Sequence, residues 1–151
     1  MKIKQLLIAI TTALALLSGG VSAADHSTIA IAVGGYDLVS YQQKNGPTRG
    51  NGHNLTIYQD NIYAFSNAEN KSTFDTNPSK YLPAYGGFCA YGASLGKKFY
   101  GDPNVYSVVD GSLYLNLDKK VQSLWNKDIS GNIAEADSLW RSIKYVPAAE
   151  L

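Results

Sequence analysis

The sequence has very little of the residue types that carry metal and nucleophilic chemistry. Its 151 residues include one cysteine, Cys89, and two histidines, His26 and His53. A single thiol cannot form a disulfide within the chain, so Cys89 is buried, metal-bound, modified or paired with a second molecule. The sequence also lacks a P-loop, a His-Glu-x-x-His zinc motif, a Cys-x-x-Cys pair and any motif for an organic cofactor.

One hydrolase-like motif is present by its letters alone. Gly92, Ser94 and Gly96 match the Gly-x-Ser-x-Gly pattern of nucleophile elbows. That motif works with a downstream acid and a downstream histidine on a larger fold. Both histidines precede Ser94, so we interpret the match as accidental and favour a protein that is not an enzyme.

The first 23 residues have the three parts of a secretory signal peptide. Lys2 and Lys4 give a positive start, residues 6–17 are apolar except for two threonines, and residues 21–23 are small. The apolar part is too short to span a bilayer comfortably. We therefore expect an exported protein, periplasmic or secreted, whose mature chain begins at Ala24 and has no membrane span.

Positive and negative charges are nearly balanced in the sequence. The chain carries 13 basic and 12 acidic side chains, a net charge of +1. Loss of Lys2 and Lys4 with the leader makes the mature chain slightly acidic. Nucleic-acid binding requires a basic stripe, so nucleic acid is not an expected partner.

Apolar alternation and turn residues predict one α+β domain after the leader. Two hairpins are expected, over residues 55–65 around Gln59-Asp60-Asn61 and over residues 105–117 around Asp110-Gly111. A short strand is expected over residues 36–41. The order of elements predicts a small antiparallel sheet of hairpins with short helices and a C-terminal helical segment.

Helical signals follow each predicted hairpin. Ser66 or Asn67 is expected to cap a helix that ends near Asp75, and residues 78–82 form a further short turn of helix. We expect two amphipathic helices near the C-terminus, and no internal repeat. The expected core residues are the aromatic ones on the apolar faces: Phe65, Phe74, Trp125 and Trp140.

The predicted organisation has four parts. They are a signal peptide over residues 1–23, a flexible lead-in over 24–35, the domain over 36–145, and a loose tail over 146–151.

Several blocks of the mature chain resemble the YHS domain. They are residues 36–41, 63–66 and 74–81, and the blocks at 82–92 and 110–116 resemble the exported, longer form of that family. The resemblance spans about residues 36–143 and implies a small α+β unit. YHS domains that carry cysteines are linked to heavy-metal handling. The positions of those cysteines correspond here to Ser40, or a neighbour, and to Ser66.

The block around the single cysteine is the candidate binding site. Gly86 and Gly87 allow a close backbone approach or a positive φ just before the thiol. The expected ligand-binding residues are Tyr85, Gly86, Gly87, Phe88, Cys89 and Tyr91. If the bound species is a metal ion of copper type, the expected donor residues are Cys89 and His53, because thiolate and imidazole suit soft and borderline ions.

The expected function is that of an exported binding module for a metal ion or a small ligand. Two alternatives stay open. One is a thiol-dependent redox protein or enzyme that uses Cys89, and the other is a structural, partner-binding domain in which the thiol is buried. Accessibility of the thiol distinguishes them, because only an exposed, low-pKa thiol is reactive.

Overall fold

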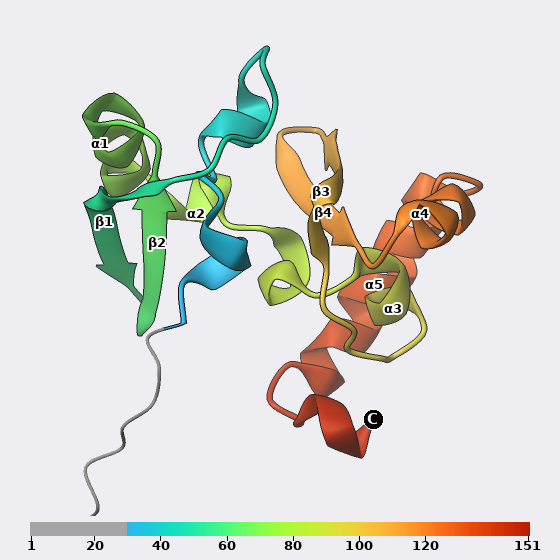
Figure 1. The fold of residues 1–151 in the computed structure, drawn as a ribbon. Coiled ribbons are helices and arrows are strands. Elements are labelled where there is room, and N and C mark those ends of the chain that lie inside the picture. Colours follow the sequence, from blue (N-terminus) through green and yellow to red (C-terminus); the bar gives the residue numbers. More distant parts are fainter. Residues whose placement is uncertain (1–29) are drawn as a thin grey trace, which may run out of the picture.

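The computed structural model describes residues 30–151, which form two halves joined by a short linker at Leu82 (Figure 1). The first half, residues 31–81, contains β1 (Asn51–Tyr58), β2 (Asn61–Phe65), α1 (Ala68–Thr76) and α2 (Pro78–Tyr81). The second half, residues 83–151, contains α3 (Ala90–Ser94), β3 (Asp102–Val109), β4 (Ser112–Asn116), α4 (Lys119–Trp125) and α5 (Ile129–Ile143). The predicted signal peptide and residues 24–29 of the lead-in lie outside the described residues.

The structure confirms the α+β class. Each half has one antiparallel pair of strands, β1 with β2 and β3 with β4, and the last long element is the C-terminal helix α5. Both predicted hairpins are present, and positive φ at both central residues of each turn gives the twist that a tight hairpin requires. In the described part of the chain, no helix is long and apolar enough to cross a membrane.

The two halves follow the same plan, so the expectation of no internal repeat was wrong. Each half opens with a 3₁₀ turn, η1 (Ala32–Gly35) or η3 (Ala84–Gly87), and the residue before it forms a parallel bridge to the second strand of the hairpin. Each hairpin has a register shift near its open end. The helix after each hairpin is capped by a side chain, Asn67 in one and Asp118 in the other. The repeat was missed because backbone geometry carries more of it than identical residues do.

The strand predicted over residues 36–41 is not formed. Tyr36 makes only an isolated bridge, and a 3₁₀ turn, η2 (Ser40–Gln42), follows. The cause is Asp37, whose carboxylate accepts hydrogen bonds from the backbone N–H groups two and three residues ahead. This local hydrogen bonding replaces the ladder that a strand would need.

Each half has its own aromatic core. Phe65 and Phe74 are fully buried in the first half, with ring centroids 4.9 Å apart. Trp125 is fully buried in the second half, 5.4 Å from the ring of Tyr114. These three core predictions are confirmed, but Trp140 is only half-buried because it lies at the edge of α5 that faces the linker.

Both ends of the described chain carry short structure. Residues 32–35 of the predicted lead-in form η1, which packs against β2. The predicted tail contains the 3₁₀ turn η4 (Ala148–Glu150), and the ammonium of Lys97 donates to the backbone carbonyl of Leu151.

Candidate functional site: a cleft between the two halves

A cleft of about 600 Å³ lies between the two halves. One wall comes from η1 and the β1–β2 turn, the other from η3, the segment before β3, and α5, with Leu82 and Pro83 between them. Small-molecule sites typically have volumes of roughly 300–1,000 Å³ and combine apolar walls with a few polar groups. The cleft therefore has the size of a site for one small molecule.

Each wall is built on a residue held in the left-handed region of backbone space. Val33 has φ 52° and Tyr85 has φ 54°, and each is followed by two glycines with positive φ. This conformation is uncommon for a residue with a side chain and is an outlier for a β-branched one such as Val33. Residues strained in this way collect at ligand sites. Both of them line the same cleft, at matching places in the two halves.

Aromatic rings cover the wall of the second half. The ring of Trp140 lies 5.7 Å from that of Tyr85 and 6.2 Å from that of Phe88. Tyr85 is buried, and its hydroxyl donates to Oδ1 of Asp137 at 3.0 Å. Burial, and then the Asp137 carboxylate, raise the pKa of the Tyr85 hydroxyl far above its usual value. The hydroxyl therefore stays a neutral donor that is already engaged, and the ring is the part that a ligand meets.

Few polar side chains line the cleft. They are Gln59 and Asn61 from the first half and Lys144 from the second. No aspartate or glutamate is part of the lining. Lys98 lies against the aromatic wall, with its ammonium 5.3 Å from the ring centroids of both Phe88 and Trp140.

Four of the six predicted ligand-binding residues line this cleft. Tyr85, Gly86, Gly87 and Phe88 belong to its lining, whereas Cys89 and Tyr91 do not. The chain turns into the core of the second half after Phe88, because Cys89 is the N-cap of α3. The sequence-based site is thus split between the cleft and the core.

The Cys89 thiol is part of a buried hydrogen-bond cluster. Its side chain is 1% exposed, and its sulfur accepts from the backbone N–H of Gly92 at 3.4 Å. The thiol donates to Oδ1 of Asn116 at 3.7 Å, and the same oxygen accepts from the backbone N–H of Tyr91 at 3.3 Å. Nδ2 of Asn116 and Nε1 of Trp125 have no partner among the described residues.

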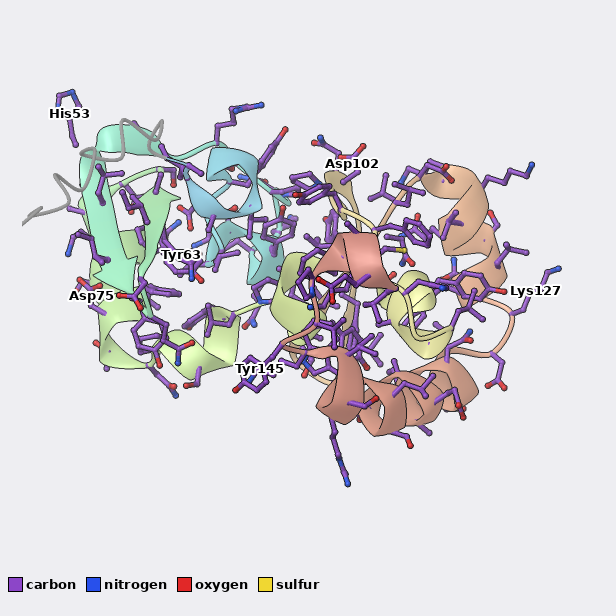
Figure 2. All side chains as sticks on the ribbon, turned by 90° about the horizontal axis from the view of Figure 1, so that it is seen from below. His53, Tyr63, Asp75, Asp102, Lys127 and Tyr145 are labelled. Carbon is purple, nitrogen blue, oxygen red and sulfur yellow. The ribbon has the colours of Figure 1, made fainter. Side chains whose placement is uncertain are left out.

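The structure does not bring the predicted copper donors together. His53 is exposed on β1 in the first half, at the outer end of the molecule, whereas Cys89 is buried in the second half (Figures 1 and 2). Within residues 30–151, no group of three or more His, Cys, Asp or Glu side chains is arranged to hold a metal ion. These residues therefore do not fit a copper-type site.

Ser40 and Ser66, the positions expected from the sequence to correspond to the cysteines of YHS domains, lie around Asp37. The hydroxyl of Ser66 donates to Oδ2 of Asp37 at 2.7 Å, and that of Ser40 donates to the backbone carbonyl of Asp37 at 2.6 Å. Asn70 also donates to Oδ2, at 2.7 Å. Asp37, Ser40 and Asn70 are buried and Ser66 is half-buried, and this hydrogen-bonded arrangement is that of a structural hub.

The hydroxyl of Ser94, in the hydrolase-like motif, is also engaged. Ser94 is 5% exposed, and its hydroxyl donates to the backbone carbonyl of Tyr91 at 2.8 Å. A nucleophile needs a base within hydrogen-bond reach, and this hydroxyl instead meets a carbonyl within its own helix.

Sequence reasoning missed the half of the site that lies outside the Cys89 block. The missed residues line the cleft from both walls: Val33, Gln59, Asn61, Tyr100, Trp140 and Lys144. One signal was available, because the four letters Ala-x-Gly-Gly occur at residues 32–35 and again at residues 84–87. Two copies of an unusual turn predict a shared structural role.

Comparisons with known proteins add nothing to the evidence for a site, which is the geometry described above. No family model, curated protein or solved structure matches the chain.

Proposed function

We propose that this protein is an exported, YHS-like binding module that holds one small organic molecule in the cleft between its halves. The observation that carries the proposal is the pair of strained residues, Val33 and Tyr85, at matching places on the two walls. The leader over residues 1–23 supports export, and the YHS-like blocks support the type of domain.

The energetics favour a ligand with apolar surface. Burying apolar area is worth about 25 cal/mol per Å², and the rings of Tyr85, Phe88 and Trp140 offer such area on one wall. Contacts within each half hold the two strained turns in place, since η1 packs on β2 and η3 packs on β4. A preformed cleft of this kind lowers the ordering cost of binding.

The alternatives that depend on Cys89 have less support. A reactive thiol must reach its substrate as an accessible thiolate, and Cys89 is 1% exposed. Metal binding requires several donors around one point, and the thiol contacts Asn116 and Gly92 instead. The buried thiol fits a structural role inside a domain that binds its ligand elsewhere.

A fluorescence titration tests the proposal. The probe is N-phenylnaphthylamine, a neutral aromatic dye that brightens when it leaves water. We expect saturable binding of one probe per chain. The variant Tyr100→Ala removes a ring that is 84% exposed and stacked 5.9 Å from Phe88, so it changes the cleft without disturbing the core. We expect roughly fivefold weaker binding, because one stacked ring contributes about 1 kcal/mol.

The matched control is Ile57→Ala. Ile57 is 76% exposed on β1 and is not part of the cleft lining, so its loss leaves probe binding unchanged. The proposal is wrong if the wild-type protein shows no saturable binding, or if Tyr100→Ala and Ile57→Ala bind the probe equally well.

A further inference from the structure

We infer that the molecule held in the cleft is a small organic anion with a flat apolar body, and that Lys144 binds its acidic group. This inference rests on the proposed function and adds the chemical class of the ligand.

The charge of the lining points to an anion. Lys144 is the charged residue of the lining, and no acidic side chain accompanies it. Within residues 30–151 the only ion pair joins Lys71 to Asp75, so Lys144 has no carboxylate partner there. A ligand carboxylate, sulfonate or phosphate supplies that partner and forms a charge-assisted hydrogen bond, which is stronger than a neutral one.

Lys98 adds positive charge to the same wall. Its ammonium donates to the backbone carbonyls of Lys144 and Val146, at 2.8 and 2.6 Å, and thus has a fixed position. It lies 5.3 Å from the ring centroids of Phe88 and Trp140. Asp137 is the acidic residue that contacts this wall, and its carboxylate accepts a hydrogen bond from the Tyr85 hydroxyl. The aromatic wall is therefore contacted by the Lys98 ammonium, and a second lysine, Lys144, belongs to the lining beside it.

The position of Lys144 separates the two parts of the ligand. Lys144 is exposed, and its ammonium lies 5.2 Å from the ring of Tyr145, which is itself 87% exposed. An acidic group bound there keeps part of its hydration at the rim, which avoids the cost of burying a charge. The flat body then lies against Trp140 and the half-buried Phe88, where apolar area is available.

The opposite wall fits a planar molecule with hydrogen-bonding edges. Val33 supplies an apolar side chain at this wall. Gln59 and Asn61 supply amide groups whose nitrogens already donate to the Tyr58 hydroxyl and to the Gln59 backbone carbonyl, so their oxygens are the groups offered to a ligand. A cleft of about 600 Å³ has room for a body of one or two fused rings.

Two dyes that differ in one acidic group provide the test. Anilinonaphthalene sulfonate is N-phenylnaphthylamine with a sulfonate added, so the ratio of their dissociation constants reports the effect of the negative charge. We expect the wild-type protein to bind the sulfonate roughly fivefold more tightly, the effect of one charge-assisted contact at an exposed site. In Lys144→Gln the two dyes bind with dissociation constants within about twofold of each other, because the ammonium is gone.

The control variant is Lys127→Gln. Lys127 is an exposed lysine in the segment between α4 and α5, far from the cleft, and Figure 2 shows it at the opposite end of the molecule from His53. The Lys127→Gln variant loses one positive charge, as Lys144→Gln does. Comparing the two variants therefore corrects for the change in the net charge of the protein. Circular dichroism of each variant confirms that the fold is intact.

The outcomes distinguish the inference from the proposed function. If the neutral dye binds in the cleft as tightly as the sulfonate, the inference is overturned while the binding function stands. If the preference for the sulfonate persists in Lys144→Gln, or is lost equally in Lys127→Gln, the assignment of Lys144 is wrong. If neither dye binds saturably, the proposed function itself fails.

Discussion

Asp37 in the first half and Cys89 in the second occupy the same place in the shared plan. Each follows the 3₁₀ turn by two residues and lies fully buried at the start of the next turn or helix. The two carboxylate oxygens of Asp37 accept five hydrogen bonds, from Val39, Ser40, Ser66 and Asn70. A carboxylate is an acceptor at both oxygens, and here every donor around it is used.

In the second half, two weaker acceptors, the Cys89 sulfur and Oδ1 of Asn116, take the place of the Asp37 carboxylate. The N–H two residues beyond Cys89 donates to Asn116, and the N–H three residues beyond donates to the Cys89 sulfur. The donors that complete the hub in the first half, Ser66 and Asn70, are matched by Leu117 and Val121, fifty-one positions later. A carboxylate at position 89 would therefore lack the side-chain donors that Ser66 and Asn70 give to Asp37, and the thiol avoids that cost.

The comparison shows that a common backbone plan can be held by charge in one half and by packing in the other. The first half depends on one satisfied carboxylate. The second half leaves Nδ2 of Asn116 and Nε1 of Trp125 unpaired and depends on the Trp125 ring, with α5 packed on α3.

The largest difference between the two halves is expected when Asp37 and Cys89, the residues at matching places, are each replaced by alanine. Asp37→Ala leaves several buried donors without an acceptor, so the free energy of unfolding should fall by about 4 kcal/mol. Cys89→Ala removes a small thiol with weak hydrogen bonds and should cost about 1 kcal/mol. Urea unfolding of both variants measures the two values. Equal losses would contradict the contrast between the halves.

Two tryptophans of the second half separate its core from the cleft. Trp125→Ala removes a fully buried ring and should lower the free energy of unfolding by about 4 kcal/mol. Trp140 is half-buried in the cleft wall, so Trp140→Ala should cost about 2 kcal/mol. The same urea series measures both. A Trp140→Ala loss as large as that of Trp125→Ala would place Trp140 in the core.

Alkaline pH is expected to weaken both halves together. Burial raises the pKa of buried tyrosines in each half: Tyr41 and Tyr63 in the first, Tyr85 and Tyr114 in the second. A raised folded pKa means that the unfolded chain loses its protons first, above the unperturbed value of 10.0. Stability is therefore complete below pH 10 and falls above it, because the tyrosines of the unfolded chain ionise before those of the folded protein.

Unfolding at a series of alkaline pH values, together with the ultraviolet absorbance of tyrosinate, checks this expectation. If one half unfolded at a lower pH than the other, two transitions would appear, and the shared dependence on buried tyrosines would be wrong.

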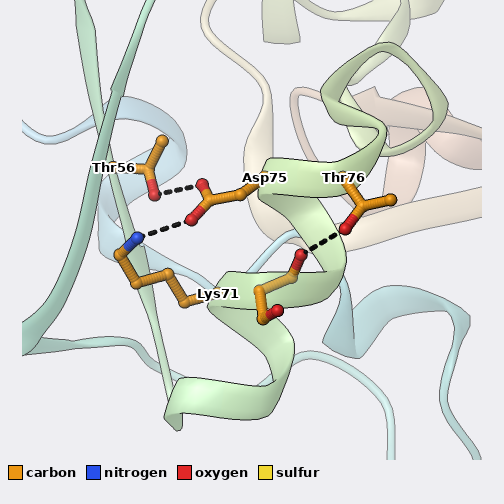
Figure 3. A network of polar contacts seen from close by, with 5 residues as sticks. Thr56, Lys71, Asp75 and Thr76 are labelled. Atoms are coloured by element: carbon orange, nitrogen blue, oxygen red, sulfur yellow. Dashed lines mark hydrogen bonds and ion pairs between the residues drawn. The ribbon is translucent and has the colours of Figure 1, made fainter.

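The smallest effect is expected at a surface ion pair that the second half lacks. Lys71 contacts Oδ2 of Asp75 at 2.5 Å, and Thr56 donates to Oδ1 of the same carboxyl, as Figure 3 shows. Partial burial opposes ionisation of Asp75, but the hydrogen bonds from Lys71 and Thr56 outweigh it and lower the pKa of the carboxyl. The matching positions in the second half are Gln122 in α4 and Asn126, the residue that follows α4.

A lowered folded pKa stabilises the protein above the unfolded value of 3.8, and this contribution is lost as the pH falls. Because both partners are more than a third exposed, Lys71→Ala should cost only about 0.4 kcal/mol near neutral pH. The cost should shrink in acid, as measured by thermal unfolding at two pH values. A cost that does not change with pH would mean that packing, and not charge, accounts for it.

Local signals in the sequence predicted most of the elements. Asp110-Gly111 identified one hairpin, because a tight turn depends on residues close in the chain. For the same reason, the choice of Ser66 or Asn67 as cap gave the start of α1 to within a residue, and Pro78 gave the start of α2. The strand at residues 36–41 failed because Asp37 competes with the ladder for backbone N–H groups. The alternation of apolar residues does not record this local hydrogen bonding.

The cleft could not be predicted in the same way. Its walls join residues more than fifty positions apart, such as Val33 and Trp140, and no periodicity records that approach. The conformation of Val33 also opposes its own preference, because β-branched residues favour extended backbone. Trp140 lies on the apolar face of α5, and sequence alone does not distinguish a core position from the wall of a cleft.

Backbone amide NMR during a titration with anilinonaphthalene sulfonate tests most directly the claim that both halves form one binding site. We expect chemical-shift changes at both strained turns, η1 and η3, and at Lys144, which directly follows α5, all following one binding curve. Changes confined to one half, or centred on α3 beside Cys89, would contradict this account.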